Sequence, residues 1–467
     1  MKQLTPGRLA RQVRLGRQRL CTDQDLCLQR LLPTAQVTAA IARHGVRFRR
    51  RLYTPLVTLW VFLYQVLSPD PSCRAAVARL LARLGVDSPR RVSAKTDPYC
   101  KARQRLPEAL LTDLAWTHGR QLHRRVGPTG LLQGRPIKIA DGTTLSMPDT
   151  QVNQKAYPQP PTQKPGLGFP MLRMVGLISL SCGAVLAAAV GPYTGKQTGE
   201  AALLRPLLAS LEPGDVLLLD AYYAHYWVLA LLWARGVDVV VHHDGKRPTD
   251  FRRGQRLGNR DQVIVWTKPS QPPPWMSWRQ YRRMPDHLMV RQLQVPVTPR
   301  GFRVKRLVLD TTLTEATAYP REDLARAYRC RWQAELDLRS IKQALRMDVL
   351  RCQSPSMVRK EVWMHLLAYN LIRHLMALAA ERGGARPREI SFTGTLQTLL
   401  AFAAVGTGPA TADPEVRLAV ILRAVATHRV GDRPDRVEPR AVKRRPKKQT
   451  YLTVPREQAR ARLLARS

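Results

Sequence analysis

The stretch "GDVLLLDAYYAHYWVLALLWARGVDVVVHH", residues 214–243, decides the class of fold. Its first and last parts, "VLLLD" and "VDVVVHH", are short and continuously apolar, a pattern typical of strands buried on both faces. The segment "YWVLALLWARG" between them is predicted to be a helix. Strands that alternate with helices predict an α/β core with a central sheet.

The residues on either side continue this pattern. "RPIKIADGTTLSM" (135–147) is an extended segment that we expect to end at Asp141-Gly142, and 171–193 reads as two strands that turn at Cys182-Gly183. A helix is expected over 198–211, with Thr198 as its cap. "FRVKRLVLDTTL" (302–313) resumes the core. We therefore assign the core to residues 131–245 and 304–382.

A segment of different composition, residues 246–303, interrupts this core. It begins basic and rich in turns, and it continues through "VIVWTKP", "SQPPPWMSW" and "HLMVRQLQVPV". We interpret it as a β-rich insertion that contains Trp266, Trp275 and Trp278. For each tryptophan, packing in the core is the ordinary role.

Helical regions are predicted on both sides of the core. Residues 1–130 carry apolar residues at helical spacing, and a basic helix is expected to start near Asp97 and Pro98. Such a helix fits a DNA groove, but it equally fits a solvated basic surface. We expect a helical region over 383–467 that ends in a basic tail, disordered when free.

The charge of the chain indicates its partner. Among 467 residues, 76 Lys and Arg stand against 34 Asp and Glu, which gives a net charge of +42. Such a field attracts polyanions, nucleic acid first and an anionic membrane second. The best apolar run, 55–67, is too short to span a bilayer. The N-terminus lacks the apolar block of a secretory signal, and the seven cysteines form no C-x-x-C pair, so we expect a cytoplasmic protein.

Two acids follow buried strands. Asp141 closes "IKIAD" and Asp220 closes "VLLLD". A carboxylate there is costly unless the strand ends at a cleft or the charge is paired. Together with a glutamate from a helix, the two aspartates could hold Mg²⁺ or Mn²⁺, which prefer hard oxygen ligands. Two such ions assist phosphodiester displacement.

A candidate for that glutamate lies in "YRCRWQAELDLRSIK", residues 328–342. On one continuous α-helix, a stripe about 60° wide would carry four residues: Tyr328, Arg331, Glu335 and Lys342. Asp337 would fall on the opposite side, so we expect its removal to leave the chemistry unchanged. The alternative without a functional role is a solvent-exposed helix face with an ordinary Arg–Glu ion pair. In the functional interpretation, Arg331 and Lys342 would bind DNA phosphates while Glu335 binds metal.

These features resemble the bacterial insertion-sequence transposases of the DDE type, the cut-and-paste group with the Y-x2-R-x3-E-x6-K box. Tyr328, Arg331, Glu335 and Lys342 match the box, and Trp332 follows its arginine as is common there. "ADGTT" and "LLLDAYYA" match the two aspartate segments, and "HLLAYNLIR" (365–373) also fits. The resemblance covers about residues 130–380.

The resemblance implies an RNase H-like fold and transposition with two Mg²⁺ or Mn²⁺ ions at Asp141, Asp220 and Glu335. It also implies cleavage at the inverted-repeat ends, a hairpin intermediate, strand transfer to target DNA, and a homodimer on paired ends. A tryptophan of the insertion, Trp275, Trp278 or Trp266, would stack on a flipped base.

Other interpretations stay open. Asp310, Asp149 and Asp244 compete as metal ligands, and none of His242, His243 and His365 has a pattern that favours a functional role. A stand-alone metal-dependent nuclease would share the acids. An inactive transposase remnant would bind DNA without cutting it, although its acids would not need to be intact. A ribosomal or packaging protein would explain the charge but not the strand-end aspartates.

Overall fold

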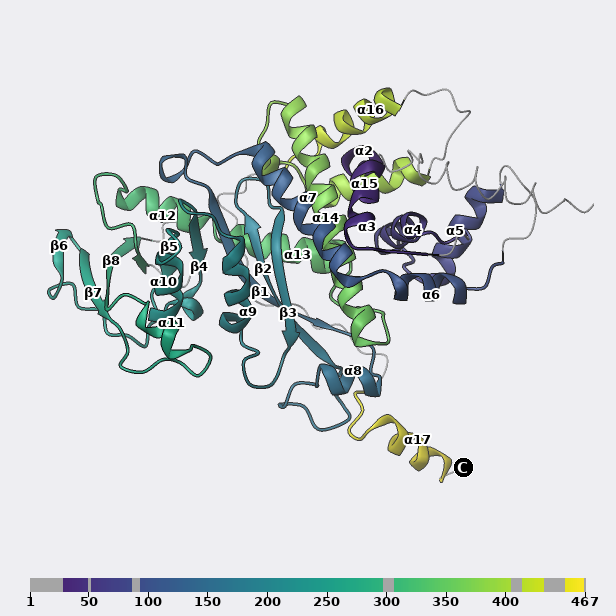
Figure 1. Ribbon diagram of the computed structural model, residues 1–467, viewed down its shortest axis with the longest axis horizontal. Coiled ribbons are helices and arrows are strands. Elements are labelled where there is room, and N and C mark those ends of the chain that lie inside the picture. The colour runs from purple at the N-terminus through teal and green to yellow at the C-terminus, as the bar shows by residue number, and fades with distance from the viewer. Residues whose placement is uncertain are drawn as a thin grey trace, which may run out of the picture. The chain divides into compact units, whose positions relative to one another are not determined.

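The computed structural model describes residues 28–48, 52–85, 93–296, 306–404, 414–431 and 450–465. The chain forms two compact units (Figure 1). Unit 1 comprises residues 1–126, 181–186 and 337–430, and unit 2 comprises residues 127–180, 187–336 and 431–467. Predictions for residues 1–27 and 432–449 lie outside the described residues.

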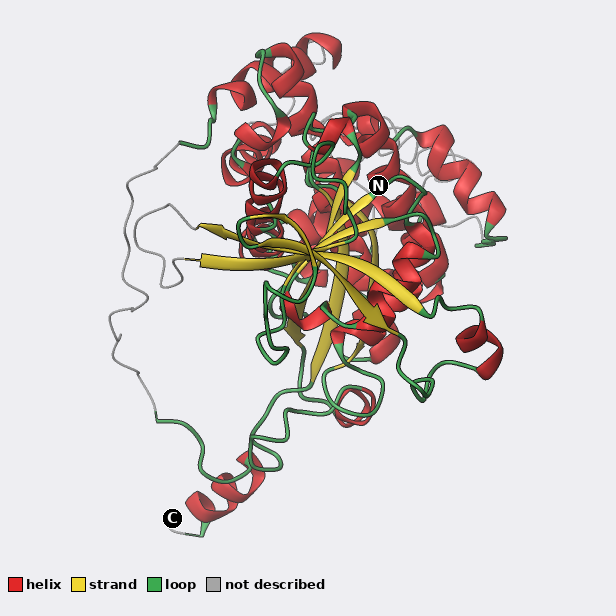
Figure 2. Ribbon diagram, turned by 90° about the vertical axis from the view of Figure 1, so that its left-hand side faces the viewer, coloured by secondary structure: helices red, strands yellow, loops and turns green. Residues whose placement is uncertain are grey.

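Unit 2 is built on a mixed sheet of nine strands in the order β3-β2-β1-β4-β5-β9-β8-β7-β6. In chain order the strands are β1 (Ile137–Ser146), β2 (Met171–Ser179), β3 (Val185–Pro192), β4 (Val216–Leu219), β5 (Asp238–His242), β6 (Gln255–Gly258), β7 (Asp261–Thr267), β8 (His287–Pro296) and β9 (Arg306–Thr311). Figure 2 shows the strands in yellow, crossing at successive angles as a twisted sheet requires.

The first five strands have the arrangement of an RNase H-like core. β4 is parallel to both β1 and β5, whereas β2 is antiparallel to β1. β2 and β3 form the predicted hairpin, with Gly183 at φ 76° in its turn. β4 and β5 are buried because apolar residues fill both of their faces. The predicted α/β fold is thereby confirmed.

The helical elements of unit 2 connect these strands. They are η1 (Leu132–Gly134), α8 (Gln151–Ala156), α9 (Glu200–Leu207), η2 (Leu208–Ser210), η3 (Ala221–Tyr223), α10 (Tyr226–Trp233), α11 (Trp278–Arg282), α12 (Arg321–Arg329), the start of α13 (Trp332–Arg339) and α17 (Arg456–Leu464). α9 packs on β2, and α10 and α12 pack on β5. Contrary to the sequence prediction, α9 begins after Gly199, and the Thr198 hydroxyl donates to the carbonyl of Gly195 instead of capping the helix.

The segment between β5 and β9 extends the core sheet with β6, β7 and β8. Arg291 of β8 and Asp261 of β7 form a buried bidentate ion pair, with N–O distances of 2.8 and 2.7 Å. Charge-assisted pairs of this geometry hold two strands in one register. Ser277 caps the short helix α11 with a capping box, which fixes the proline-rich loop before it.

Unit 1 is helical. Its elements are α2 (Leu28–Leu31), α3 (Thr34–Arg43), α4 (Pro55–Leu67), α5 (Cys73–Gly85), α6 (Asp97–Arg105), α7 (Glu108–Val126), the end of α13, η4 (Ser340–Ala344), α14 (Pro355–Arg382), η5 (Pro387–Glu389), α15 (Phe392–Ala404) and α16 (Pro414–Thr427). The predicted basic helix is α6, which begins at Asp97 and has Pro98 in its first turn.

The long helix α14 forms the core of unit 1 and packs against α7. The Asn370 side chain is buried, and its amide bonds the backbone of Val185 and the carbonyl of Ala115. Gly119 of α7 makes this approach possible, because a Cβ there would lie 2.2 Å from the carbonyl oxygen of Val185. None of the described helices is long and apolar enough to cross a membrane.

Candidate active site

Asp141 and Asp220 lie side by side on one face of the sheet. In the parallel pair β1–β4, Ile139 is paired with Leu218, so residues two positions further on each strand are neighbours. β1 does not end at Asp141 as predicted, because its pairing with β2 continues to Ser146. β4 ends at Leu219, however, so both carboxylates lie where β4 no longer flanks β1.

Arg331 connects Asp141 to Glu335. Its Nη1 lies 3.6 Å from Asp141 Oδ2, and its Nη2 lies 3.2 Å from Glu335 Oε1. The Arg331 and Asp141 side chains are largely buried, whereas about a third of the Glu335 side chain is exposed, 36%. One guanidinium therefore sits between carboxylates that come from a strand and from a helix.

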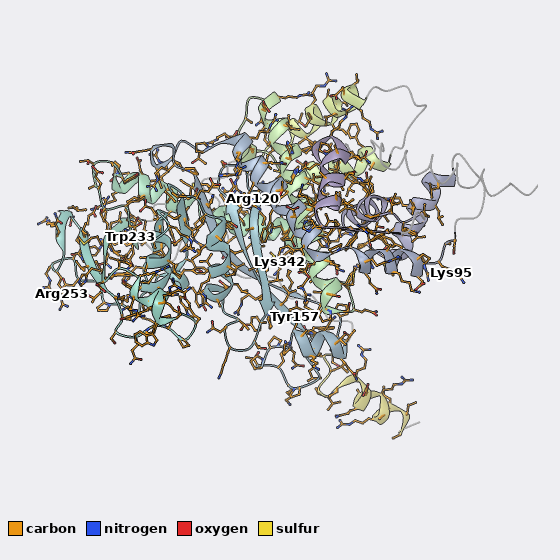
Figure 3. All side chains as sticks on the ribbon, viewed as in Figure 1. Lys95, Arg120, Tyr157, Trp233, Arg253 and Lys342 are labelled. Carbon is orange, nitrogen blue, oxygen red and sulfur yellow. The ribbon has the colours of Figure 1, made fainter. Side chains whose placement is uncertain are left out.

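The box is not one continuous α-helix, which corrects the predicted stripe. α12 ends at Arg329, α13 begins at Trp332, and residues 340–344 form a π-helix. Tyr328 is buried, and its hydroxyl shares a hydrogen bond with the backbone of His242. Lys342, labelled in Figure 3, is half-buried in the π-helical turn and belongs to unit 1. Angles of 100° per residue therefore do not relate Lys342 to Tyr328.

The electrostatics of the site favour a bound cation. Burial raises the pKa of Asp141 to about 6, and the charges of Asp220 and Glu335 add to the rise. The Gly142 N–H and Arg331 oppose this shift without cancelling it. Burial alone would lower the pKa of Arg331, but Tyr328, Asp141 and Glu335 raise it. Three carboxylates around one arginine leave an excess of negative charge that a divalent ion would neutralise.

The carboxylates of this site are suitable ligands for Mg²⁺ or Mn²⁺. Asp141, Asp220 and Glu335 offer only carboxylate oxygens, the ligands that these ions prefer. Within the described ranges, no group of three or more His, Cys, Asp or Glu side chains is already arranged around a single point. The Arg331 guanidinium provides the reason, since it takes up the space between Asp141 and Glu335.

The competing acids lie elsewhere. Asp310 is on the opposite face of the sheet, because its neighbour Leu309 pairs with His242 and the faces alternate along a strand. It is fully buried and lies 2.8 Å from His243 Nδ1. Asp149 is exposed, and Asp244 accepts the backbone N–H of Lys246 in a turn.

The three tryptophans of the insertion differ in exposure. Trp266 is buried, with the Arg247 guanidinium 3.9 Å from its ring centroid. Trp275 is partly covered by Arg205, at 4.1 Å. Trp278 is 59% exposed at the start of α11, where it meets Tyr281 edge to face. Trp278 is therefore the tryptophan whose ring has most free surface.

Two residues near the acids were missed by sequence reasoning. Leu219 pairs with Val241, so His242 is the neighbour of Asp220 in the next strand. His242 ends a buried strand. The criterion that selected the two aspartates, a polar residue at the end of a continuously apolar run, could therefore have identified it. Glu200 begins α9 and accepts the Tyr223 hydroxyl at 3.2 Å, directly after the Asp220 turn. Nothing in the sequence links Glu200 to that turn.

The order of the first five strands and the acids on neighbouring strands agree with the RNase H-like core that the resemblance to DDE transposases implies. The chain belongs to the transposases of the DDE type: the family described as the transposase DDE domain matches residues 132–371, more than half of the chain. The predicted resemblance of the chain to this family is thereby confirmed. The chain is a DDE transposase of an insertion sequence, and such transposases use divalent metal ions.

The chain is similar to a transposase in sequence and, more weakly, to a solved structure. The transposase InsG of insertion sequence element IS4, from Escherichia coli strain K12, is 27% identical over 434 residues, which cover 90% of this chain and 92% of that protein. A piggyBac transposase, solved by cryo-EM in a synaptic complex with hairpin DNA, is similar over 86% of this chain and 85% of that chain. Its TM-score is 0.41, and the sequence identity is 10%.

Proposed function

We propose that this transposase moves its insertion sequence by cut-and-paste, with Asp141, Asp220 and Glu335 holding two Mg²⁺ or Mn²⁺ ions. The observation that carries the proposal is the register that makes Asp141 and Asp220 neighbours, with Glu335 tied to Asp141 through Arg331. The buried, negatively charged surroundings of Asp141 support the same assignment.

When bound, the two metal ions would activate the attacking oxygen and stabilise the leaving oxygen of the scissile phosphodiester. The three carboxylates set where this chemistry occurs, since each is anchored on a different element. Arg331 would bind a DNA phosphate when metal ions take its place beside the carboxylates, and Lys342 would bind the DNA backbone as well. Tyr328 fixes the end of α12 against β5 through its bond to the backbone of His242.

The cut-and-paste route includes a hairpin on the element end. A base must leave the stack for the strand to bend sharply, and an exposed aromatic ring can hold that base. Trp278 supplies such a ring, supported by Tyr281 at a centroid distance of 5.3 Å. Trp275 is the second candidate, once Arg205 moves from its ring.

The partners are double-stranded DNA at the inverted-repeat ends and at the target. The net charge of +42 supports this, because Lys and Arg side chains release counterions from phosphates. Two copies of the chain act as a homodimer on paired ends. The protein works in the bacterial cytoplasm, at the nucleoid.

Cleavage of native end DNA tests the function. The full chain is incubated with a duplex that carries the inverted repeat and its flank, with Mg²⁺ or EDTA, and the strands are separated on a denaturing gel. We expect a nick at the element boundary that requires Mg²⁺, followed by a hairpin on the element side. A duplex with a scrambled repeat is the control.

Two results would contradict the proposal. Binding of the end without Mg²⁺-dependent cleavage would identify an inactive remnant. Equal cleavage of the scrambled and native duplexes would identify a nuclease without end recognition.

A further inference from the structure

A cavity of about 560 Å³ lies within unit 1, far in sequence from the acids of the candidate active site. Its wall is formed by α4, the loop from α4 into α5, α6, the first turns of α14, and residues 345–354, which lead into α14. Ligand-binding cavities commonly have volumes of roughly 300–1,000 Å³. The cavity is therefore large enough for a small organic ligand.

Arg103 of α6 lies on the floor of this cavity, and its side chain is buried. Its guanidinium lies 5.0 Å from the ring centroids of both Phe62 and Tyr99. Nη1 donates to Gln65 Oε1 at 3.2 Å, and Nη2 donates to the weak acceptor Cys73 Sγ at 3.1 Å. The buried Nε has no hydrogen-bond partner among the described residues. A buried cation with an unused donor needs an acceptor.

His365 of α14 supplies a second buried polar group without a partner. It lines the same cavity, it is 5% exposed, and its Nδ1 makes no hydrogen bond within the described part of the chain. Glu361, one turn before it, is the acid of the cavity wall. Its carboxylate already accepts the backbone N–H groups of Arg351 and Cys352, at 2.9–3.0 Å. The Arg103 guanidinium lies close enough to Glu361 for the two charges to attract each other, but the unused donor at Nε stays without a hydrogen-bond partner among the described residues.

The wall carries more positive than negative charge. Among the residues that line the cavity, the three arginines Arg103, Arg346 and Arg351 stand against one acid, Glu361. Arg346 already donates to the carbonyl of Pro69, and Asp70 lies near Arg351. The thiols of Cys73, Cys100 and Cys352 also face the cavity, but the Arg103 guanidinium lies beside them and repels a metal cation. An anion is therefore the ligand that the charges favour.

We infer that this cavity binds a nucleoside 5′-phosphate, with the phosphate on Arg103 and Arg351. Apolar side chains complete the wall, among them Val66, Met357 and the edge of Phe62, and a base would pack against this apolar surface. A nucleotide extruded from bound DNA and a free nucleotide present the same chemistry. The inference is independent of the roles of Asp141, Asp220 and Glu335.

The fluorescence of 2-aminopurine deoxyriboside 5′-monophosphate tests the site on the full chain. We expect saturable binding, with displacement by deoxyadenosine monophosphate at lower concentration than by deoxyadenosine or by inorganic phosphate. Arg351→Gln removes an exposed charge at the cavity without disturbing the core, and it should weaken binding about tenfold or more. Arg103→Met should do the same if circular dichroism shows that it folds.

A matched control and a second arm complete the experiment. Arg382→Gln removes an exposed charge at the other end of α14 and should leave binding unchanged. In the second arm, end duplexes carry 2-aminopurine at successive positions. A fluorescence increase that Arg351→Gln abolishes identifies a nucleotide extruded from DNA, whereas a response to the monophosphate alone identifies a free nucleotide.

Three results would overturn the inference. One is the absence of both a saturable response to the monophosphate and an Arg351-dependent response in the duplexes. Another is binding that Arg351→Gln and folded Arg103→Met leave unchanged. The third is equal competition by inorganic phosphate and by the nucleotide, which would show that no base is bound.

Discussion

At the scale of one residue, the charge of the buried Asp141 lowers the stability of the folded chain when no metal is bound. Burial raises its pKa from 3.8 to about 6, so the folded chain holds this proton more tightly than the unfolded chain. The free energy of unfolding therefore falls as the pH rises from 3.8 to about 6, and it stays lowered above that range. In chelator at pH 7, Asp141→Asn should be more stable than the parent by up to roughly 3 kcal/mol.

Urea unfolding in EDTA, from pH 4 to pH 7.5, measures this difference. The two proteins should converge toward acid pH, where Asp141 is protonated in both states. Added Mg²⁺ should stabilise the parent but not the variant, since binding to the folded state alone raises its stability. A variant that is less stable than the parent at neutral pH would refute the electrostatic description of the site.

Asp337 has a structural role that helical angles alone did not predict. It is fully buried and paired with Arg373 and Arg388. Asp337→Ala would leave two cations without their partner, so we expect a loss of about 3–5 kcal/mol in the free energy of unfolding. Thermal and urea unfolding measure it. A stability within experimental error of the parent would contradict the ion-pair description.

Arg331→Ala should lower single-turnover cleavage at saturating DNA without changing which end is chosen, because phosphate contacts position the substrate and carry no sequence information. Arg329→Ala is the matched control, since this arginine is exposed two residues earlier. Competition between native and mutated ends measures the choice of end. If both variants cleave equally well, Arg331 does not hold the scissile phosphate.

At the scale of elements, β1, α9 and the turn after β4 meet at Gly142. A Cβ on this residue would lie 2.4 Å from the carboxyl carbon of Glu200. Gly142→Ala should move the flexible Glu200 carboxyl group away from Tyr223 and cost about 1 kcal/mol of stability, the contribution of the lost hydrogen bond.

Urea unfolding of four variants isolates this contact. Gly176→Ala on β2 is the control, because the nearest atom to its new Cβ is 3.8 Å away. Gly142→Ala combined with Glu200→Ala should lose less stability than the sum of the two single changes. Strict additivity would show that the glycine and the glutamate do not interact.

Local pattern was enough to predict the elements but not their irregularities. "VLLLD" and "VDVVVHH" are strands because continuous apolar runs fit a sheet covered on both faces. The two aspartates are neighbours because β1 and β4 are parallel, with Ile139 paired to Leu218. The break at residues 330–331 was not predictable, since Arg331 is fixed by Asp141, a residue far away in the chain. The cavity that Arg103 and His365 share was not predictable either, because these two residues are also far apart in the chain.

At the scale of the whole molecule, binding DNA and cutting it depend on different charges. The excess of 42 positive charges acts on any DNA and should weaken steeply with salt, whereas the three carboxylates matter only for the chemistry. Replacement of a carboxylate by its amide keeps the shape and reduces repulsion toward phosphate. Binding and cleavage can therefore be separated in one set of variants.

Single-turnover cleavage of saturating end DNA in Mg²⁺ by Asp141→Asn, Asp220→Asn and Glu335→Gln tests the central claim most directly. Asp149→Asn, an exposed acid outside the cluster, is the control. The account predicts that each of the three loses cleavage while binding the end as tightly as the parent or more tightly, and that the control cuts normally. Cleavage retained by any of the three, in a folded protein that binds DNA, would show that its carboxylate is not part of the catalytic centre.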